Sequence, residues 1–142
     1  MSMLQAKVKW TGGLQFVGES GSGHAIVMDA DAEFGGHNSG ARPTELVLIG
    51  LGGCSGMDVA SILQKKREHV TGVEVNVKGE KSEDHPKRFT NIEMEYVVKG
   101  RNLSEEAVKK AIDLSFTKYC SVKATLEGVA KVTYTYKIVA EQ

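Results

Sequence analysis

Hydrophobic and polar residues alternate strictly in two stretches of the chain, residues 72–80 and 89–100. In the first stretch Val73, Val75 and Val77 share one face. In the second, Ile92 and Met94 share one face in the same way. A period of two residues is typical of strands with one buried side. We therefore predict two half-buried strands, joined by the polar loop at residues 81–88.

Shorter β-compatible stretches lie at both ends of the sequence. Three precede the central region, at residues 3–10, 14–20 and 23–30, and glycine-containing turns at 11–13 and 20–23 separate them. Residues 33–41 have the composition of a loop, and residues 129–141 predict a closing strand.

Two stretches are typical of helices. The first is expected from Pro43 to about Arg67, because proline suits the first helical position. Ser104 is a good N-cap for the second helix. That helix is expected to end at Cys120. Its inner stripe should be Val108, Ala111, Ile112, Ser115 and Tyr119. The order of elements predicts an α+β fold in a single domain, residues 1–142.

The long helix contains an unusual number of glycines at its centre. Gly50, Gly52, Gly53 and Gly56 surround Cys54, and together they cost about 3–4 kcal/mol of helix propensity relative to alanine. Two interpretations account for them. A second copy of the helix could cross closely at Gly50 in a symmetric dimer, or the glycines could admit bulky side chains from the sheet.

Composition and charge exclude several classes of partner. The 142 residues carry a formal net charge of zero, so no overall field favours nucleic acid or an acidic membrane. The N-terminus lacks the apolar region of a signal peptide. The apolar run at residues 46–57 is interrupted by Asp58 and is short for a bilayer span. We expect a cytoplasmic protein that binds neither nucleic acid nor membrane.

The two cysteines, Cys54 and Cys120, are the candidates for chemistry. They are too few for a disulfide scaffold, and no histidine spacing indicates a zinc site, so we expect no metal and no cofactor. A reactive thiol needs a nearby cation, for which Arg42 and His37 are candidates. Glu45 is a candidate polar partner across a two-fold axis. The alternative is that Cys54 is a buried, inert cysteine.

The stretches "ARPTELVLIGLGGCSGMDV" (residues 41–59) and "KYCSVKATL" (residues 118–126) resemble the osmotically inducible protein C and organic hydroperoxide resistance (OsmC/Ohr) superfamily, and within it the YhfA-like branch. The resemblance implies an intertwined α+β homodimer with antiparallel sheets wrapped around central helices. It also implies that organic hydroperoxide is reduced by Cys54 as the peroxidatic thiol and Cys120 as the resolving thiol. A dithiol reductant of the lipoyl or thioredoxin type would then open the disulfide.

Two positions depart from the peroxidase branches of that superfamily. Thr44 stands where those branches carry a glutamate, and no arginine precedes Arg42. Arg42 and Glu45 could serve in place of the missing pair. If they do not, the alternative function is a non-enzymatic module that binds a small apolar ligand or senses redox state.

Overall fold

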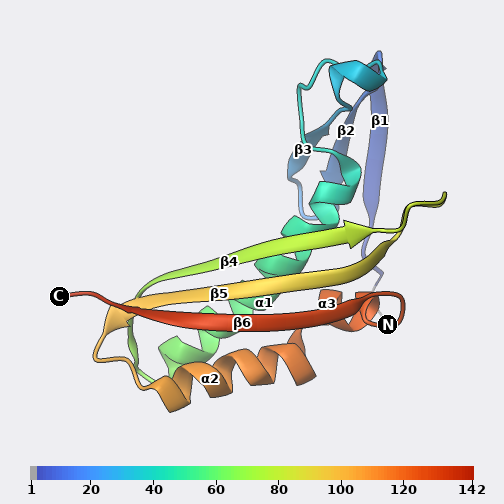
Figure 1. Cartoon of the computed structure of the whole chain (residues 1–142). Coiled ribbons are helices and arrows are strands. Elements are labelled where there is room, and N and C mark those ends of the chain that lie inside the picture. Colours follow the sequence, from blue (N-terminus) through green and yellow to red (C-terminus); the bar gives the residue numbers. More distant parts are fainter. Residues whose placement is uncertain (1–2) are drawn as a thin grey trace. The chain divides into compact units, whose positions relative to one another are not determined.

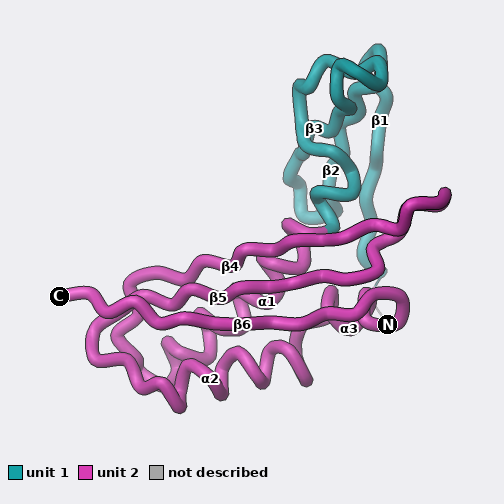
Figure 2. Tube along the Cα trace, viewed as in Figure 1, with its two compact units in different colours: residues 1–47 teal, residues 48–142 magenta. Residues whose placement is uncertain are grey.

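The computed structural model describes residues 3–142. They form two compact units, which meet in the sequence between Val47 and Leu48 (Figure 2). The first unit contains the strands β1 (Ala6–Gly12), β2 (Gln15–Ser20) and β3 (Ala25–Met28) in one antiparallel sheet, and the 3₁₀ turn η1 (Ala32–Phe34). All three predicted strands are confirmed. β2 and β3 are shorter than expected, whereas β1 begins later and continues two residues further, to Gly12. Its register shifts between Trp10 and Gly12, where the predicted turn begins.

The loop after β3 is held by one buried carboxylate. Asp29 accepts hydrogen bonds from the backbone N–H groups of Ala30, His37 and Ser39 and from the Ser39 hydroxyl. These donors favour the ionised form, and they hold the pKa of Asp29 well below its usual range, with the Ser39 hydroxyl as the largest cause. The loop is therefore ordered without regular secondary structure.

The central helix α1 (Pro43–Lys65) crosses from one unit to the other along the chain. It begins at the predicted residue and ends two residues early. Its length of 23 residues and a mean hydropathy of 1.8 over an 18-residue window would allow it to cross a membrane. We expected a segment too short for that, because we counted only the apolar run at residues 46–57. The helix continues past this run on both sides. The same composition suits a core helix, and Leu51, Val59 and Leu63 are fully buried in the hydrophobic core.

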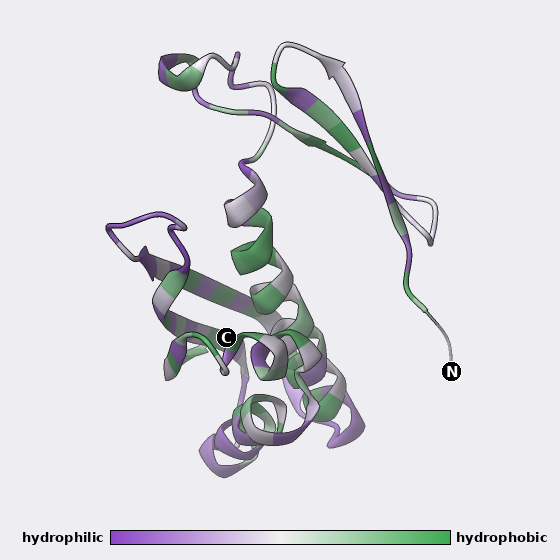
Figure 3. Cartoon of the chain, turned by 90° about the vertical axis from the view of Figure 1, so that its right-hand side faces the viewer, coloured by the Kyte–Doolittle hydropathy of each residue, from purple (hydrophilic) through white to green (hydrophobic). Residues whose placement is uncertain are grey.

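The second unit is built on the sheet β4 (His69–Lys81), β5 (Phe89–Arg101) and β6 (Lys131–Ala140), and α1 and α2 cover one side of it (Figure 1). The two long strands form the predicted hairpin. Figure 3 shows the alternating hydrophilic and hydrophobic bands along the strands and the mostly hydrophobic α1.

The expectation of purely antiparallel sheets was wrong for the last strand. β6 pairs with β5 in parallel, from Asn91 opposite Lys131 to Gly100 opposite Ala140. Parallel neighbours need a long crossover connection. The segment between β5 and β6 provides it, with α2 (Glu105–Leu114), the π-helical turn η2 (Ser115–Tyr119) and α3 (Ser121–Leu126).

The predicted second helix is therefore divided into three parts. Ser104 caps α2 as expected, because its side chain accepts a hydrogen bond from the N–H of Ala107. Four members of the inner stripe are buried, but Tyr119 is 49% exposed. The wider turn η2 rotates the residues after Ser115 relative to an ideal α-helix, so the stripe ends there, and α3 was not predicted.

Candidate functional site

The structure brings Cys54 and Cys120 together within the second unit. Cys54 lies in the middle of α1 and is partly exposed, whereas Cys120 lies between η2 and α3 and is 4% exposed. Both cysteines are free thiols, and they lie near enough for Cys54 to affect the pKa of Cys120. The pair thus consists of one partly exposed cysteine and one buried cysteine near each other.

The surroundings of Cys120 keep it protonated. Burial raises the pKa of Cys120 to about 11, and the nearby Cys54 acts in the same direction. The backbone N–H groups of Lys123 and Val122 oppose this rise, and the Lys123 N–H lies 3.4 Å from the sulfur, which caps α3. At neutral pH Cys120 is therefore a neutral thiol beside Cys54.

Lys123 is a cation three residues after Cys120, yet its ammonium has other partners. It lies 4.2 Å from the centre of the Phe116 ring and forms a salt bridge with Glu127. Lys123 therefore acts on Cys120 through its backbone.

A chain of buried hydroxyl groups lies next to the two cysteines. The Ser55 Oγ is 2.6 Å from the Tyr96 hydroxyl and 2.7 Å from the Ser115 Oγ, and Ser115 donates to Asp58 Oδ2 at 2.8 Å. Burial raises the pKa of Tyr96 to about 12, and the nearby Cys120 contributes. The sequence analysis predicted that Ser115 lies on a buried stripe but did not connect it with Ser55. A serine beside a candidate nucleophile was the available signal.

The other two predicted site residues, Arg42 and Glu45, lie in the first unit. The Arg42 guanidinium donates to Asn38 Oδ1 at 2.8 Å and to the carbonyl of Gly40 at 3.0 Å, and it pairs with Asp31 at 3.6 Å. Glu45 accepts from the backbone N–H of Arg42 at 2.8 Å, as in a capping box. The structure thus brings these two residues together at the start of α1. The remaining cation candidate, His37, donates its backbone N–H to Asp29.

The four glycines of α1 divide into two pairs. A Cβ on Gly52 would lie 3.2 Å from Val77, and one on Gly56 would lie 3.4 Å from Val75. No atom lies within 4 Å of a Cβ built on Gly50 or Gly53. The first pair therefore admits valines from the sheet, as one interpretation predicted, and the second pair leaves a flat surface.

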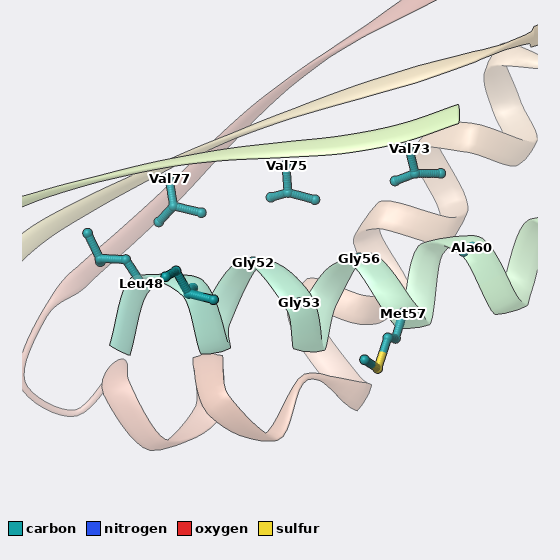
Figure 4. A pocket seen from close by; sticks show the side chains of 10 residues that line it. Leu48, Gly52, Gly53, Gly56, Met57, Ala60, Val73, Val75 and Val77 are labelled. Atoms are coloured by element: carbon teal, nitrogen blue, oxygen red, sulfur yellow. The ribbon is translucent and has the colours of Figure 1, made fainter. Parts of the chain in front are cut away.

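An apolar groove runs between α1 and β4. It has a volume of about 610 Å³, and Gly52, Gly53 and Gly56 form its floor opposite the valines of β4 (Figure 4). Its rim includes Ile49 and Met57, which are 62% and 75% exposed. No group of three or more histidine, cysteine or acidic residues suited to a metal ion occurs within residues 3–142.

Comparison with known proteins identifies the family. The model of the family described as "OsmC-like protein" matches residues 36–135. Protein YhfA of Escherichia coli (strain K12) is 47% identical over 140 residues, which cover 96% of this chain and 99% of YhfA. A solved structure of a hypothetical protein from Aquifex aeolicus is 31% identical, covers both chains completely and has a TM-score of 0.87.

A more distant solved structure shares the fold. The organic hydroperoxide resistance protein OhrB of Bacillus subtilis is 18% identical, with a TM-score of 0.63 over 96% of this chain and 98% of that one. The family model covers most of the sequence, including both cysteines, and the YhfA match covers nearly all of it. The chain therefore belongs to the OsmC-like protein family.

Proposed function

We propose that this protein reduces organic hydroperoxides through Cys54 and Cys120. The observation that carries the proposal is that a partly exposed thiol and a buried, protonated thiol lie near each other. The name of the fold relative OhrB, an organic hydroperoxide resistance protein, agrees with this reaction.

The reaction would proceed in three steps. The Cys54 thiolate attacks the peroxide ROOH, which breaks the O–O bond, gives Cys54 sulfenic acid and releases the alkoxide, protonated to ROH. Cys120 then attacks the sulfenic sulfur, and its proton leaves with the hydroxyl as water, so that a disulfide forms. A dithiol of the lipoyl or thioredoxin type reduces that disulfide to two thiols and is itself oxidised to a disulfide.

The assignment of roles follows from exposure. The attacking sulfur must reach a substrate in solution, and only Cys54 of the pair is accessible. The resolving sulfur must reach only Cys54, so burial does not hinder it. A cysteine pair that cycles between thiol and disulfide in this way suits the reducing cytoplasm.

We propose that Arg42 of a second copy of the chain is the cation that stabilises the Cys54 thiolate, and that Glu45 of that copy is a polar partner of the thiol. Twelve helical positions separate Arg42 from Cys54 of its own chain by about 18 Å along the axis. The support is the charge of Arg42 and the hydrogen bond from its N–H to Glu45. The Arg42 guanidinium is fixed in place by Asn38 and Gly40. Fixed, oriented charges stabilise an anion without reorganisation cost.

We also propose that two copies of the chain associate through the open face of α1. Gly50 and Gly53 leave room for a close helix crossing, and Ile49 and Met57 offer apolar surface beside it. The family model spans the boundary between the two compact units, which supports treating residues 1–142 as one domain.

The apolar groove favours a second candidate function, the binding of a small apolar ligand. Its volume is within the range of small-molecule sites, and its lining is formed by aliphatic residues and glycines. In that case the protein would bind an apolar molecule without turnover. Displacement of a fluorescent fatty acid would measure such binding.

One assay separates the two functions. Reduced protein is mixed with cumene hydroperoxide and dihydrolipoamide, and peroxide loss is followed. We expect Cys54→Ser to abolish turnover and Cys120→Ser to consume one equivalent and then stop. The matched control Ser61→Ala removes an exposed hydroxyl from the same helix and should keep full activity. Equal peroxide loss by the unmodified protein and Cys54→Ser would refute the enzymatic function.

A second experiment tests the roles of Arg42 and Glu45. The rate of Cys54 alkylation by iodoacetamide is measured against pH in the Cys120→Ser background. We expect Arg42→Ala to move the midpoint toward higher pH and Arg42→Lys to restore part of the difference, because lysine keeps the charge but loses the planar fork. An unchanged profile in Arg42→Ala would remove Arg42 from the site.

A further inference from the structure

Four side chains form a continuous hydrogen-bonded chain that joins three elements, and three of the four are buried. Tyr96 comes from β5, Ser55 and Asp58 from α1, and Ser115 from η2. The distances between successive oxygens are 2.6, 2.7 and 2.8 Å. Ser55, Ser115 and Tyr96 are 1% exposed or less.

The direction of these hydrogen bonds follows from the acceptor at one end. The Ser115 hydroxyl donates its hydrogen bond to Asp58 Oδ2. The Ser55 hydroxyl must then donate to Ser115, and the Tyr96 hydroxyl donates to Ser55. Each hydroxyl therefore donates to the next oxygen in the chain, in the order Tyr96, Ser55, Ser115, Asp58. This fixed direction makes the chain a rigid connection between the elements.

Each end of the central hydrogen bond is attached directly to one cysteine. Ser55 follows Cys54 in α1. Ser115 is the first residue of η2, and its carbonyl accepts the backbone N–H of Cys120 at 2.9 Å. One hydrogen-bonded connection between the two cysteine backbones therefore passes through Ser55 and Ser115.

We infer that Ser55 and Ser115 are positioning residues for the Cys54–Cys120 pair, an inference that rests on the proposed function of that pair. Their hydrogen bond fixes the register between α1 and η2, and thereby holds the two sulfurs where a disulfide forms readily. Asp58 and Tyr96 orient the two hydroxyls that make this bond.

Apolar contacts alone would not fix this register. The residues around the pair are aliphatic and aromatic, and such surfaces tolerate small shifts. A disulfide requires Cα atoms about 4.4–6.8 Å apart and a defined dihedral angle. A directional hydrogen bond beside each cysteine restricts the pair to fewer arrangements, and this raises the effective concentration of one thiol at the other.

The inference is tested by the equilibrium between the cysteine pair and dithiothreitol. Reduced protein and oxidised dithiothreitol exchange to protein disulfide and reduced dithiothreitol, with two electrons and two protons transferred. The ratio of the four species, measured after acid quenching and thiol labelling, gives the equilibrium constant. This measurement requires no peroxide.

We expect Ser115→Ala to lower the equilibrium constant for disulfide formation about tenfold, which corresponds to about 30 mV for a two-electron couple. Ser55→Ala should give the same loss and provides a second variant if Ser115→Ala folds poorly. Tyr96→Phe leaves the hydrogen bond between the serines intact, so it should change the constant less than threefold.

Two controls separate positioning from loss of stability. Ser61→Ala removes an exposed serine hydroxyl from α1 and should leave the constant unchanged. Val98→Ala truncates a buried residue of β5 without removing a hydroxyl, so it should lower the urea midpoint of unfolding and leave the constant within threefold. An equal loss in Val98→Ala and Ser115→Ala would overturn the inference.

The outcome is distinguishable from failure of the proposed function. If the unmodified protein forms the disulfide with dithiothreitol but does not consume hydroperoxide, the proposed function fails and the serine variants still report on positioning. If Ser55→Ala and Ser115→Ala keep the constant of the unmodified protein, or if that protein forms no Cys54–Cys120 disulfide, the positioning role is refuted.

Discussion

The two sides of helix α1 within the second unit differ in what they contact. On one side, Leu51, Ser55 and Val59 are fully buried, and Gly52 packs against valines of β4. On the other side, Met57 is exposed, and no atom lies near a Cβ built on Gly50. We call these the core side and the open side of α1.

The difference shows that the same residue type serves two purposes in one helix. On the core side, glycine removes a side chain that would collide with the sheet. On the open side it keeps the helix surface flat, which is useful only if something approaches it. Cys54 is intermediate in exposure, so its sulfur can contact Cys120 and remain accessible.

The largest effect is expected from filling the core side. Gly52→Leu should lower the free energy of unfolding by about 1–3 kcal/mol, because a Cβ at this position already approaches Val77 at 3.2 Å and the larger side chain must displace β4. Urea denaturation monitored by far-ultraviolet circular dichroism measures the change. A leucine at Gly52 that is no more disruptive than one at Gly50 would show that the two sides do not differ.

The buried thiol of Cys120, which packs in the hydrophobic core, predicts a loss of stability in alkali. The pKa of Cys120 is raised from 9.0 to about 11 in the folded protein, so the folded state binds more protons than the unfolded state between these values. The contribution of the protonated Cys120 thiol to the free energy of unfolding is complete below pH 9. It falls by about 1–3 kcal/mol as the pH rises to 11.

Urea midpoints measured from pH 8 to pH 11 test this effect. The variant Cys120→Ala keeps Tyr96, another buried group whose pKa is raised, so the difference between the two pH profiles reports the thiol together with its effect on Tyr96. Parallel profiles would mean that Cys120 ionises as easily in the folded chain as in the unfolded one.

On the open side, Gly50→Leu should separate two copies without unfolding the chain. No atom of the same chain lies within 4 Å of the new Cβ, whereas a closely crossing partner helix would collide with it. Sedimentation velocity at micromolar concentration should change from twice the chain mass of 15.4 kDa to a single chain. If the Gly50→Leu variant still sediments as a dimer, the interface lies elsewhere on the chain.

The smallest effect on stability is expected from an alanine at Gly53, on the open side of α1, in the single chain that the Gly50→Leu variant should form. In the Gly50→Leu background, Gly53→Ala should raise the free energy of unfolding by up to about 1 kcal/mol through helix propensity, since the added methyl group meets no atom. Thermal unfolding measures the gain. A loss of stability would show that this face of the single chain is packed.

The sequence predicted most elements of the fold because local patterns specify them. Alternation at residues 72–80 and 89–100 identified the hairpin of β4 and β5, and Ser104 identified the start of α2. The direction of β6 was missed because alternation is the same in parallel and antiparallel strands. The turn η2 was missed because no residue type in it departs from a helical pattern.

The candidate site was predictable only in part. Residue type and spacing single out Cys54 and Cys120, and the structure places them near each other. Ser55 and Ser115 are sixty residues apart, and serine is common on any surface, so their hydrogen bond depends on tertiary packing. The contact of Arg42 with Glu45 is local and could have been recognised as a capping pattern.

From the parallel pairing of β6 we expect this strand to join the sheet late in folding. The hairpin of β4 and β5 closes over the seven residues between Lys81 and Phe89, whereas the paired residues Asn91 and Lys131 of β5 and β6 are 40 positions apart. Long loops close late because their entropy is lost before their contacts form. Cys120 lies between β5 and β6, so we expect Cys54 to lie beside an incomplete core until β6 pairs with β5. In a newly synthesised chain, premature oxidation of Cys54 would therefore compete with folding itself.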